Sequence, residues 1–127
     1  MKKLYFICLA GRIRSKRAAE LFASRFETAY FGINKYAYYH EGHNDKPEYV
    51  MIALQKKLDS AEYVFVMEKY MKDALESLIG HSSDKIVVLG IEDKYVYESQ
   101  ELEAILLEKI SPYLKDVDDN EEHRQDK

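Results

Sequence analysis

The chain has 127 residues and a formal net charge of −4, with 46% hydrophobic and 33% charged residues. This length and composition are typical of one globular domain with its own core. The acidic balance argues against bulk nucleic-acid binding, which usually requires a basic excess. Cys8 is the single cysteine, which excludes an internal disulfide and fits a reducing compartment such as the cytoplasm.

The N-terminal third of the chain predicts a strand, a helix and a second strand. Residues 3–9 (KLYFICL) are almost all apolar, as in a strand buried on both faces. This run is too short for a membrane span, and it lacks the cleavage site of a signal peptide. Residues 28–33 predict the second strand and residues 34–46 a polar loop. Between the two strands Ser15 is a good N-cap for a helix. The apolar face of that helix would consist of Ala18, Leu21, Phe22 and Phe26.

The remaining chain alternates helices with strands. Pro47 suits the first turn of a helix, because its missing N–H is no loss there. Gly80 favours the end of the following helix. Apolar runs at 63–67 (YVFVM) and 85–89 (KIVVL) predict two more buried strands. The apolar faces of the three helices are Met51, Leu54, Leu58 and Ala61, then Met71, Ala74, Leu75 and Leu78, and finally Leu102, Ile105, Leu106 and Ile110.

This alternation predicts a three-layer α/β fold, in which a four-stranded parallel sheet has helices on both faces. Residues 90–98 should be irregular, and Pro112 should kink or end the last helix. We expect residues 1–114 to form the domain and residues 115–127 to form an acidic, disordered tail. Ligands of such folds bind beyond the carboxyl ends of the strands. Cys8 lies at that end of the first strand, and Asp93 lies in the loop after the last one.

Chemistry is concentrated in the segment from Cys8 to Ser15 (CLAGRIRS), which has the form C-x5-R-S between a strand and a helix. The helix start and Arg14 both favour the thiolate of Cys8, which is the nucleophilic form. The planar guanidinium of Arg14 suits two phosphoryl oxygens, and the hydroxyl of Ser15 can assist departure of the thiolate. Gly11 tolerates the positive φ that a tight loop requires. Backbone N–H groups would bind phosphate at Leu9, Ala10, Gly11, Arg12 and Ile13.

The spacing alone is a weak signal, because a free cysteine at a strand end is often a buried packing residue. The surrounding pattern favours the functional interpretation of Cys8. A buried strand precedes the segment, a glycine lies within it, and a serine and a helix follow it.

The motif C-L-x-G-x-I-R-S, followed by A-x-E-L-F at 18–22, resembles the low-molecular-weight protein tyrosine phosphatases. The chain is more similar still to a short bacterial branch of predicted tyrosine phosphatases. Residues 65–69 (FVMEK), 93–97 (DKYVY) and 111–114 (SPYL) continue the resemblance in the same order. The resemblance implies a flavodoxin-like sheet, hydrolysis of a phosphomonoester through a phosphocysteine, and no metal or organic cofactor.

The resemblance also implies that Asp93 is the general acid and then the base for the hydrolytic water. A phenolic leaving group has a pKa near ~10, so its departure benefits from a proton donor. The residues alone leave Glu92, Asp93 and Glu98 as alternatives for this role. Tyr95 in the same loop is predicted to contact the aromatic ring of the substrate.

Three positions depart from the family pattern. Gly11 stands where Asn is usual, and Lys16 and Lys94 stand where Pro is usual. These departures leave a second function open, a phosphate- or phosphopeptide-binding module with weak or lost catalysis. Arsenate reduction ranks lower, because its thioredoxin-coupled route needs further cysteines.

We therefore expect a cytoplasmic phosphatase that acts on phosphorylated proteins or small aryl phosphates. We expect no nucleic-acid or membrane partner. The natural substrate and the oligomeric state are left open by the sequence.

Overall fold

The computed structural model describes residues 1–36, 48–115 and 117. Strands and helices alternate along the chain, as the hydrophobic pattern predicts. The elements are β1 (Lys3–Cys8), α1 (Arg14–Phe22), β2 (Glu27–Gly32), the 3-10 helix η1 (Ile33–Tyr36), α3 (Glu48–Ser60), β3 (Tyr63–Val66), α4 (Lys69–Ile79), β4 (Ile86–Val88) and α5 (Gln100–Leu114).

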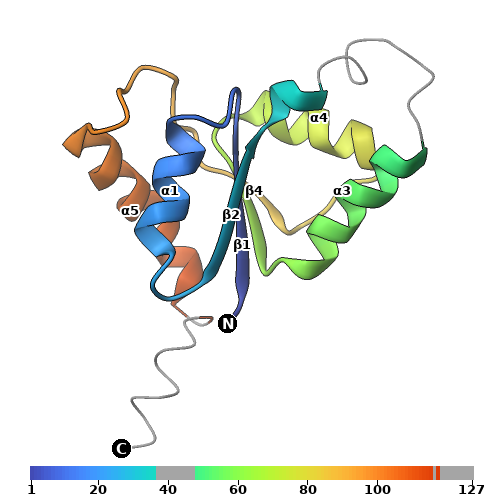
Figure 1. Cartoon of the computed structure of the whole chain (residues 1–127), viewed down its shortest axis with the longest axis horizontal. Coiled ribbons are helices and arrows are strands. Elements are labelled where there is room, and N and C mark those ends of the chain that lie inside the picture. Colours follow the sequence, from blue (N-terminus) through green and yellow to red (C-terminus); the bar gives the residue numbers. More distant parts are fainter. Residues whose placement is uncertain (37–47, 116, 118–127) are drawn as a thin grey trace, which may run out of the picture.

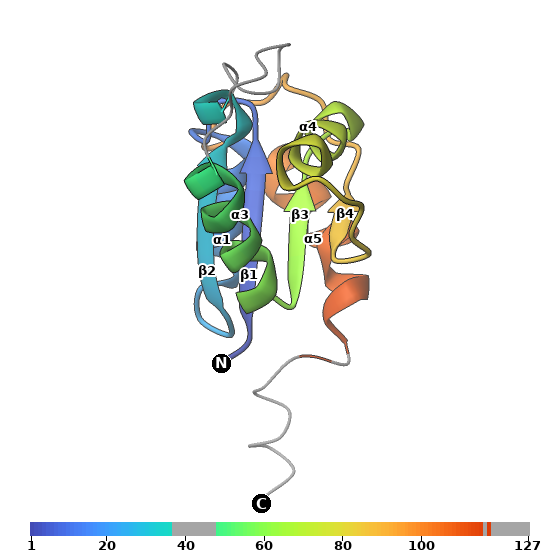
Figure 2. The same ribbon diagram turned by 90° about the vertical axis from the view of Figure 1, so that its right-hand side faces the viewer.

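The four strands form one parallel sheet in the order β2-β1-β3-β4. Helices α1 and α5 cover one face of the sheet, and α3 and α4 cover the other (Figures 1 and 2). The predicted three-layer α/β fold with a flavodoxin-like parallel sheet is thus confirmed. Because the strands are parallel, their carboxyl ends meet at one edge, and the loops after β1, β3 and β4 gather there.

The central strand β1 shows why its sequence is apolar throughout. It lies between two strands and between two helical layers, so neither face reaches solvent. Leu4, Phe6 and Ile7 are fully buried. The ring of Phe6 stacks on Phe65 of β3 at 5.5 Å and on Phe22 of α1 at 6.2 Å between ring centroids. This packing fixes β1, and with it the loop that follows Cys8.

The prediction about the start of the first helix is wrong. Helix α1 begins at Arg14, so Ser15 lies inside the helix, and the N-cap is Ile13, whose side chain makes no capping hydrogen bond. The Ser15 hydroxyl is turned toward Cys8 instead. Pro112 lies within α5 and does not end it, since the helix continues to Leu114.

Other boundaries agree closely with the sequence pattern. Gly80 ends α4 with a left-handed φ of 85°, as predicted. Residues 90–98 are irregular. Most of the predicted 34–46 loop, Pro47 and nearly all of the predicted tail lie outside the described residues. Among the described residues, every helix is too short or too polar to cross a membrane.

Candidate active site

Cys8 ends β1, and its sulfur lies at the centre of the turn that leads into α1. Its side chain is buried. The backbone N–H of Gly11 donates to Sγ at 3.2 Å, and the hydroxyl of Ser15 lies 3.0 Å from the same atom. Helix α1 starts two residues after Arg12, so its N-terminus also faces this turn. A backbone N–H, a serine hydroxyl and a helix N-terminus thus lie around one sulfur, as in a turn that binds anions.

The turn is pressed against the end of β2. Gly11 has a φ of 72°, and a Cβ on it would lie 2.6 Å from the backbone nitrogen of Gly32. A Cβ on Gly32 would lie 2.4 Å from the carbonyl carbon of Ala10. The backbone N–H of Asn34 donates to the carbonyl of Leu9 at 2.9 Å. The loop therefore rests on backbone contacts that only glycine permits, with no side chain between the two segments.

Arg14 is almost fully buried, and its guanidinium joins three loops of the same sheet edge. Its Nη1 donates to Glu68 Oε1 at 2.6 Å and to the carbonyl of Ile91 at 2.8 Å. Its Nη2 lies 3.9 Å from Asp93 Oδ2. A buried cation requires such partners, because burying it alone is costly. The same contacts fix the orientation of the planar fork beside the Cys8 turn.

Asp93 and Glu92 lie next to each other in the loop after β4 but point to different partners. Asp93 faces Arg14, and its side chain is 58% exposed. Glu92 pairs with Lys94 at 3.9 Å. Of the three carboxylates that the sequence left as alternatives, Asp93 is the one that the structure brings to the Cys8 turn.

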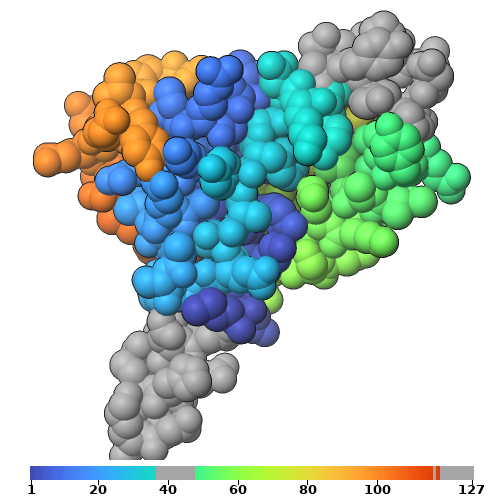
Figure 3. Space-filling view, viewed as in Figure 1, coloured from blue at the N-terminus to red at the C-terminus, as the bar shows by residue number. Residues whose placement is uncertain are grey.

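A hollow of about 190 Å³ opens over Cys8. Figure 3 shows the two segments that bound it, the loop after β1 in blue and the loop after β4 in orange, at the same end of the molecule. The side chains and backbone that line it belong to Cys8, Leu9, Ala10, Arg12, Ile13, Arg14 and Asp93. A hollow of this size accommodates a phosphoryl group and part of the group that carries it.

No protein-family model and no curated protein matches the sequence. Solved structures do match it. The low molecular weight protein tyrosine phosphatase from Streptococcus pyogenes aligns over 98% of each chain, with a TM-score of 0.66 and 16% identity.

The chain has the fold of the low molecular weight protein tyrosine phosphatases.

Two other solved structures share this phosphatase fold. One is a cysteine-to-serine mutant of the YwlE arginine phosphatase of Bacillus subtilis with a phosphorylated active-site serine. It matches 89% of this chain and 95% of its own, at a TM-score of 0.55 and 19% identity. The other is Vibrio vulnificus Wzb in complex with benzylphosphonate. It matches 91% of this chain and 99% of its own, at a TM-score of 0.54 and 15% identity.

Tyr95 does not line the hollow of this phosphatase fold. It is partly buried and lies against α5, beside Glu101 and Ile105. Its predicted contact with a substrate ring therefore stays a prediction, because Tyr95 is not among the residues that line the Cys8 hollow.

Glu68 and Tyr70 are at the site although the sequence assigned a role to neither of them, and Glu68 entered only as part of the stretch 65–69. Glu68 occupies the N-cap position of α4, yet its side chain makes no capping bond and reaches Arg14 instead. Burial raises the pKa of the Tyr70 hydroxyl, and so does the Glu68 carboxylate, while Arg14 opposes the shift. The sequence signal that could have found them was their position, since both lie within four residues of the end of the buried strand β3, at the edge where Cys8 lies.

Tyr97 ties the Asp93 loop to α1. Its hydroxyl donates to the carboxylate of Glu20. Its ring lies 5.2 Å from Lys16 Nζ and 5.7 Å from the guanidinium carbon of Arg17. Arg17 in turn pairs with Glu103 of α5 at 2.8 Å. The loop that carries Asp93 is therefore anchored four residues after that carboxylate.

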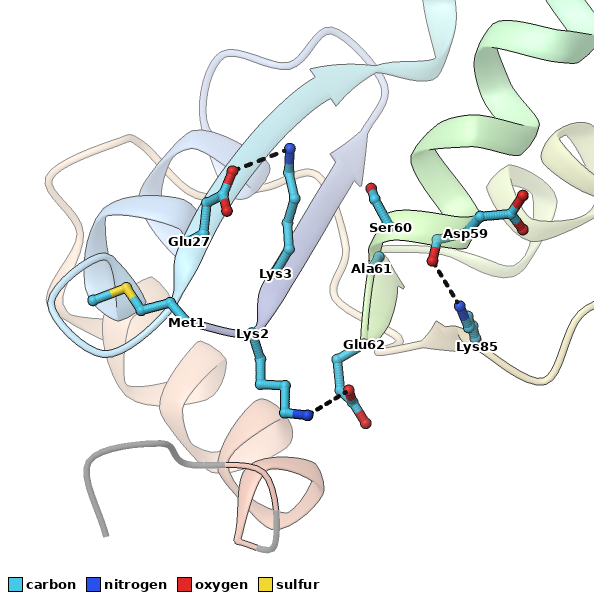
Figure 4. A pocket seen from close by; sticks show the side chains of 9 residues that line it. All are labelled: Met1, Lys2, Lys3, Glu27, Asp59, Ser60, Ala61, Glu62 and Lys85. Carbon is cyan, nitrogen blue, oxygen red and sulfur yellow. Dashed lines mark hydrogen bonds and ion pairs between the residues drawn. The ribbon is translucent and has the colours of Figure 1, made fainter. Parts of the chain in front are cut away.

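A larger hollow of about 480 Å³ lies at the opposite, amino-terminal edge of the sheet (Figure 4). Each of the three lysines that line it already has a partner. Lys3 pairs with Glu27 at 3.4 Å, Lys2 with Glu62 at 4.0 Å, and Lys85 donates to the carbonyl of Leu58 at 3.0 Å. None of the residues that line it is a cysteine or histidine. The chemistry of the chain therefore centres on the smaller hollow.

Within the described residues, no group of three or more His, Cys, Asp or Glu side chains is placed to hold a metal ion.

Proposed function

We propose that this chain is a cysteine-dependent phosphatase that hydrolyses aryl phosphate monoesters, foremost phosphotyrosine in proteins. One observation carries the proposal. The sulfur of Cys8 accepts a backbone hydrogen bond at 3.2 Å and lies 3.0 Å from a serine hydroxyl, at the base of a hollow that Arg14 and Asp93 line. The shared fold with tyrosine phosphatases supports this function, and so does a relative in complex with an aromatic phosphonate.

In the first step the Cys8 thiolate attacks the phosphorus atom, and the bond between phosphorus and the phenolic oxygen breaks. The electron pair of that bond leaves with the oxygen, which takes a proton from the Asp93 carboxyl group. The products of this step are a free phenol and a phosphocysteine. The exposed position of Asp93 at the mouth of the hollow suits this role, because the leaving oxygen lies away from the sulfur.

In the second step a water molecule attacks the phosphorus atom of the phosphocysteine, and Asp93 accepts the proton of that water. The bond between phosphorus and sulfur breaks, and Cys8 leaves as a thiolate. A hydrogen bond from Ser15 Oγ stabilises the departing thiolate, and inorganic phosphate is released.

Charge on the phosphoryl oxygens is stabilised in both steps by Arg14 and by the backbone N–H groups of residues 9–13. The guanidinium needs no reorganisation during the reaction, since Glu68 and the carbonyl of Ile91 already fix it. An arginine held in this way can present its fork to two oxygens, which lysine cannot do.

A second candidate function is a phosphopeptide-binding module with little turnover. It is favoured by the exposure of Asp93 and by Lys94, which stands after it where the family usually has Pro. A mobile or solvated acid would slow expulsion of the leaving group without weakening phosphate binding.

Turnover of para-nitrophenyl phosphate separates the two functions. The wild type should hydrolyse it, vanadate should inhibit the reaction, and Cys8→Ser should abolish it while the fold is retained. Cys8 is the single cysteine, so this substitution removes the only thiol. Binding of phosphate or phosphopeptide by a wild-type protein without turnover would establish the module instead.

A further inference from the structure

Arg12 is a cation at the mouth of the Cys8 hollow that forms no ion pair with any described residue. It lines the hollow, and its side chain is exposed. No carboxylate among the described residues lies within ion-pair distance of its guanidinium. The backbone of Arg12 belongs to the turn, where its N–H is expected to bind phosphate. Its side chain is therefore available for a separate role.

The neighbouring cations all have partners. Arg14 pairs with Glu68, and Arg17 pairs with Glu103. Lys16 lies over the ring of Tyr97. Among the described residues at this site, Arg12 is therefore the cation that has neither an ion-pair partner nor an aromatic ring beside it.

The size of the hollow decides which part of a ligand Arg12 can reach. A volume of about 190 Å³ is filled by a phosphoryl group and part of a ring. Arg14, which is buried at its inner side, is the cation placed to bind the phosphoryl group. The exposed guanidinium of Arg12 therefore meets whatever adjoins the phosphorylated side chain on the protein surface. Leu9, which is 39% exposed, gives the same rim an apolar contact.

We infer that Arg12 binds a second anionic group of the substrate, and that this site prefers phosphotyrosine segments with acidic side chains beside the phosphorylated residue. A guanidinium fork is well suited to a carboxylate. The inference rests on the proposed function for the binding of the phosphoryl group. The contact between Arg12 and a neighbouring carboxylate would make the site select among different phosphotyrosine segments.

Binding and turnover of two phosphotyrosine peptides test this inference. One peptide carries Glu on both sides of the phosphotyrosine, and the other carries Gln at the same positions. Affinities are measured with Cys8→Ser protein, which cannot turn the peptides over, and kcat/KM with the protein that retains Cys8. We expect a preference of about threefold to fivefold for the acidic peptide, the size of one exposed ion pair. This preference should shrink in 0.5 M NaCl, because salt of that order screens exposed charges.

Arg12→Gln should remove the preference in both measurements. The ratio between the two peptides is the readout, because any general damage to the loop affects both peptides alike. Lys16→Gln is the matched control, since it removes one positive charge nearby and should leave the ratio unchanged. Circular dichroism verifies that each variant is folded.

Equal affinity of Cys8→Ser protein for the two peptides would overturn the inference, and so would an unchanged preference in Arg12→Gln. Absence of binding to either peptide would also overturn it, together with the proposed function. Preferential binding of the acidic peptide without turnover by the wild type would support the inference while refuting the hydrolase.

Discussion

Arg14 and Glu68 form a 2.6 Å ion pair although 54 residues separate them in the chain. The arginine starts α1 after the first strand, and the glutamate precedes α4 after the third strand of the sequence. The pair joins the two halves of the sheet at its carboxyl edge. It also holds the guanidinium beside the turn that contains Cys8.

Loss of Glu68 should therefore affect both stability and rate. Glu68→Ala leaves the buried Arg14 guanidinium with the Ile91 carbonyl and the more distant Asp93. We expect the free energy of unfolding to fall by about 1–2 kcal/mol, a value that allows for the partial exposure of Glu68. We expect kcat/KM to fall about tenfold as the fork loses its orientation. Urea unfolding and steady-state kinetics measure the two effects.

Asp73→Ala is the control on the same helix, because within the described residues Asp73 pairs with the exposed Lys69 alone, at 3.2 Å. It should change the free energy of unfolding by less than about 0.5 kcal/mol. Equal effects of the two substitutions would show that the Arg14–Glu68 pair has no special role.

Asp93→Asn should slow the first step without weakening phosphate binding. The amide keeps the shape of the side chain but cannot deliver a proton. We expect kcat for phenyl phosphate to fall by about a hundredfold, while inhibition by inorganic phosphate changes by less than about twofold. Glu92→Gln serves as control and should stay near the wild type. If Glu92→Gln lost activity and Asp93→Asn kept it, the acid would have to be reassigned to Glu92.

Gly32→Ala should displace the phosphate-binding loop although Gly32 lies in a different strand. Its added Cβ would lie 2.4 Å from the carbonyl carbon of Ala10, so one of the two segments must move. We expect a loss of about 1–3 kcal/mol in stability and at least about a tenfold loss in kcat/KM. Gly80→Ala is the control, because its Cβ would meet only the end of Met51 at 3.7 Å. It should cost about 1 kcal/mol through its positive φ and leave KM unchanged.

Tyr97→Phe tests whether the anchor of the acid loop matters for catalysis. The substitution removes the hydroxyl that donates to Glu20 but keeps the ring beside Lys16. We expect kcat for phenyl phosphate to fall by about threefold to tenfold, with a smaller loss for para-nitrophenyl phosphate, whose leaving group needs less protonation. A purely structural role would reduce both rates by the same factor. A rate identical to wild type on both substrates would show that the anchor is dispensable.

The fold was largely determined by local patterns. The run at 3–9 is apolar on both faces, and a strand with that property must lie inside a sheet covered by helices. Alternation of strands and helices then leads to a parallel sheet, whose carboxyl edge receives Cys8. Gly11 was also predicted correctly as the residue with positive φ, because the need for it is local to a tight turn. The error at Ser15 concerns the start of a helix, where its hydroxyl lies beside the Cys8 sulfur instead of capping the backbone.

Only the tertiary structure decided which distant residues complete the site. Nothing near Arg14 in the sequence indicates that Glu68 is its partner, because the pairing depends on the order of the strands in the sheet. The close approach of Gly32 to the turn likewise depends on β2 lying beside β1. Neighbouring carboxylates such as Glu92 and Asp93 have the same chemistry, so their sequence cannot say which one faces the hollow. The sequence by itself thus determined the loop that carries the thiol, whereas the packing of the strands selected the groups that surround it.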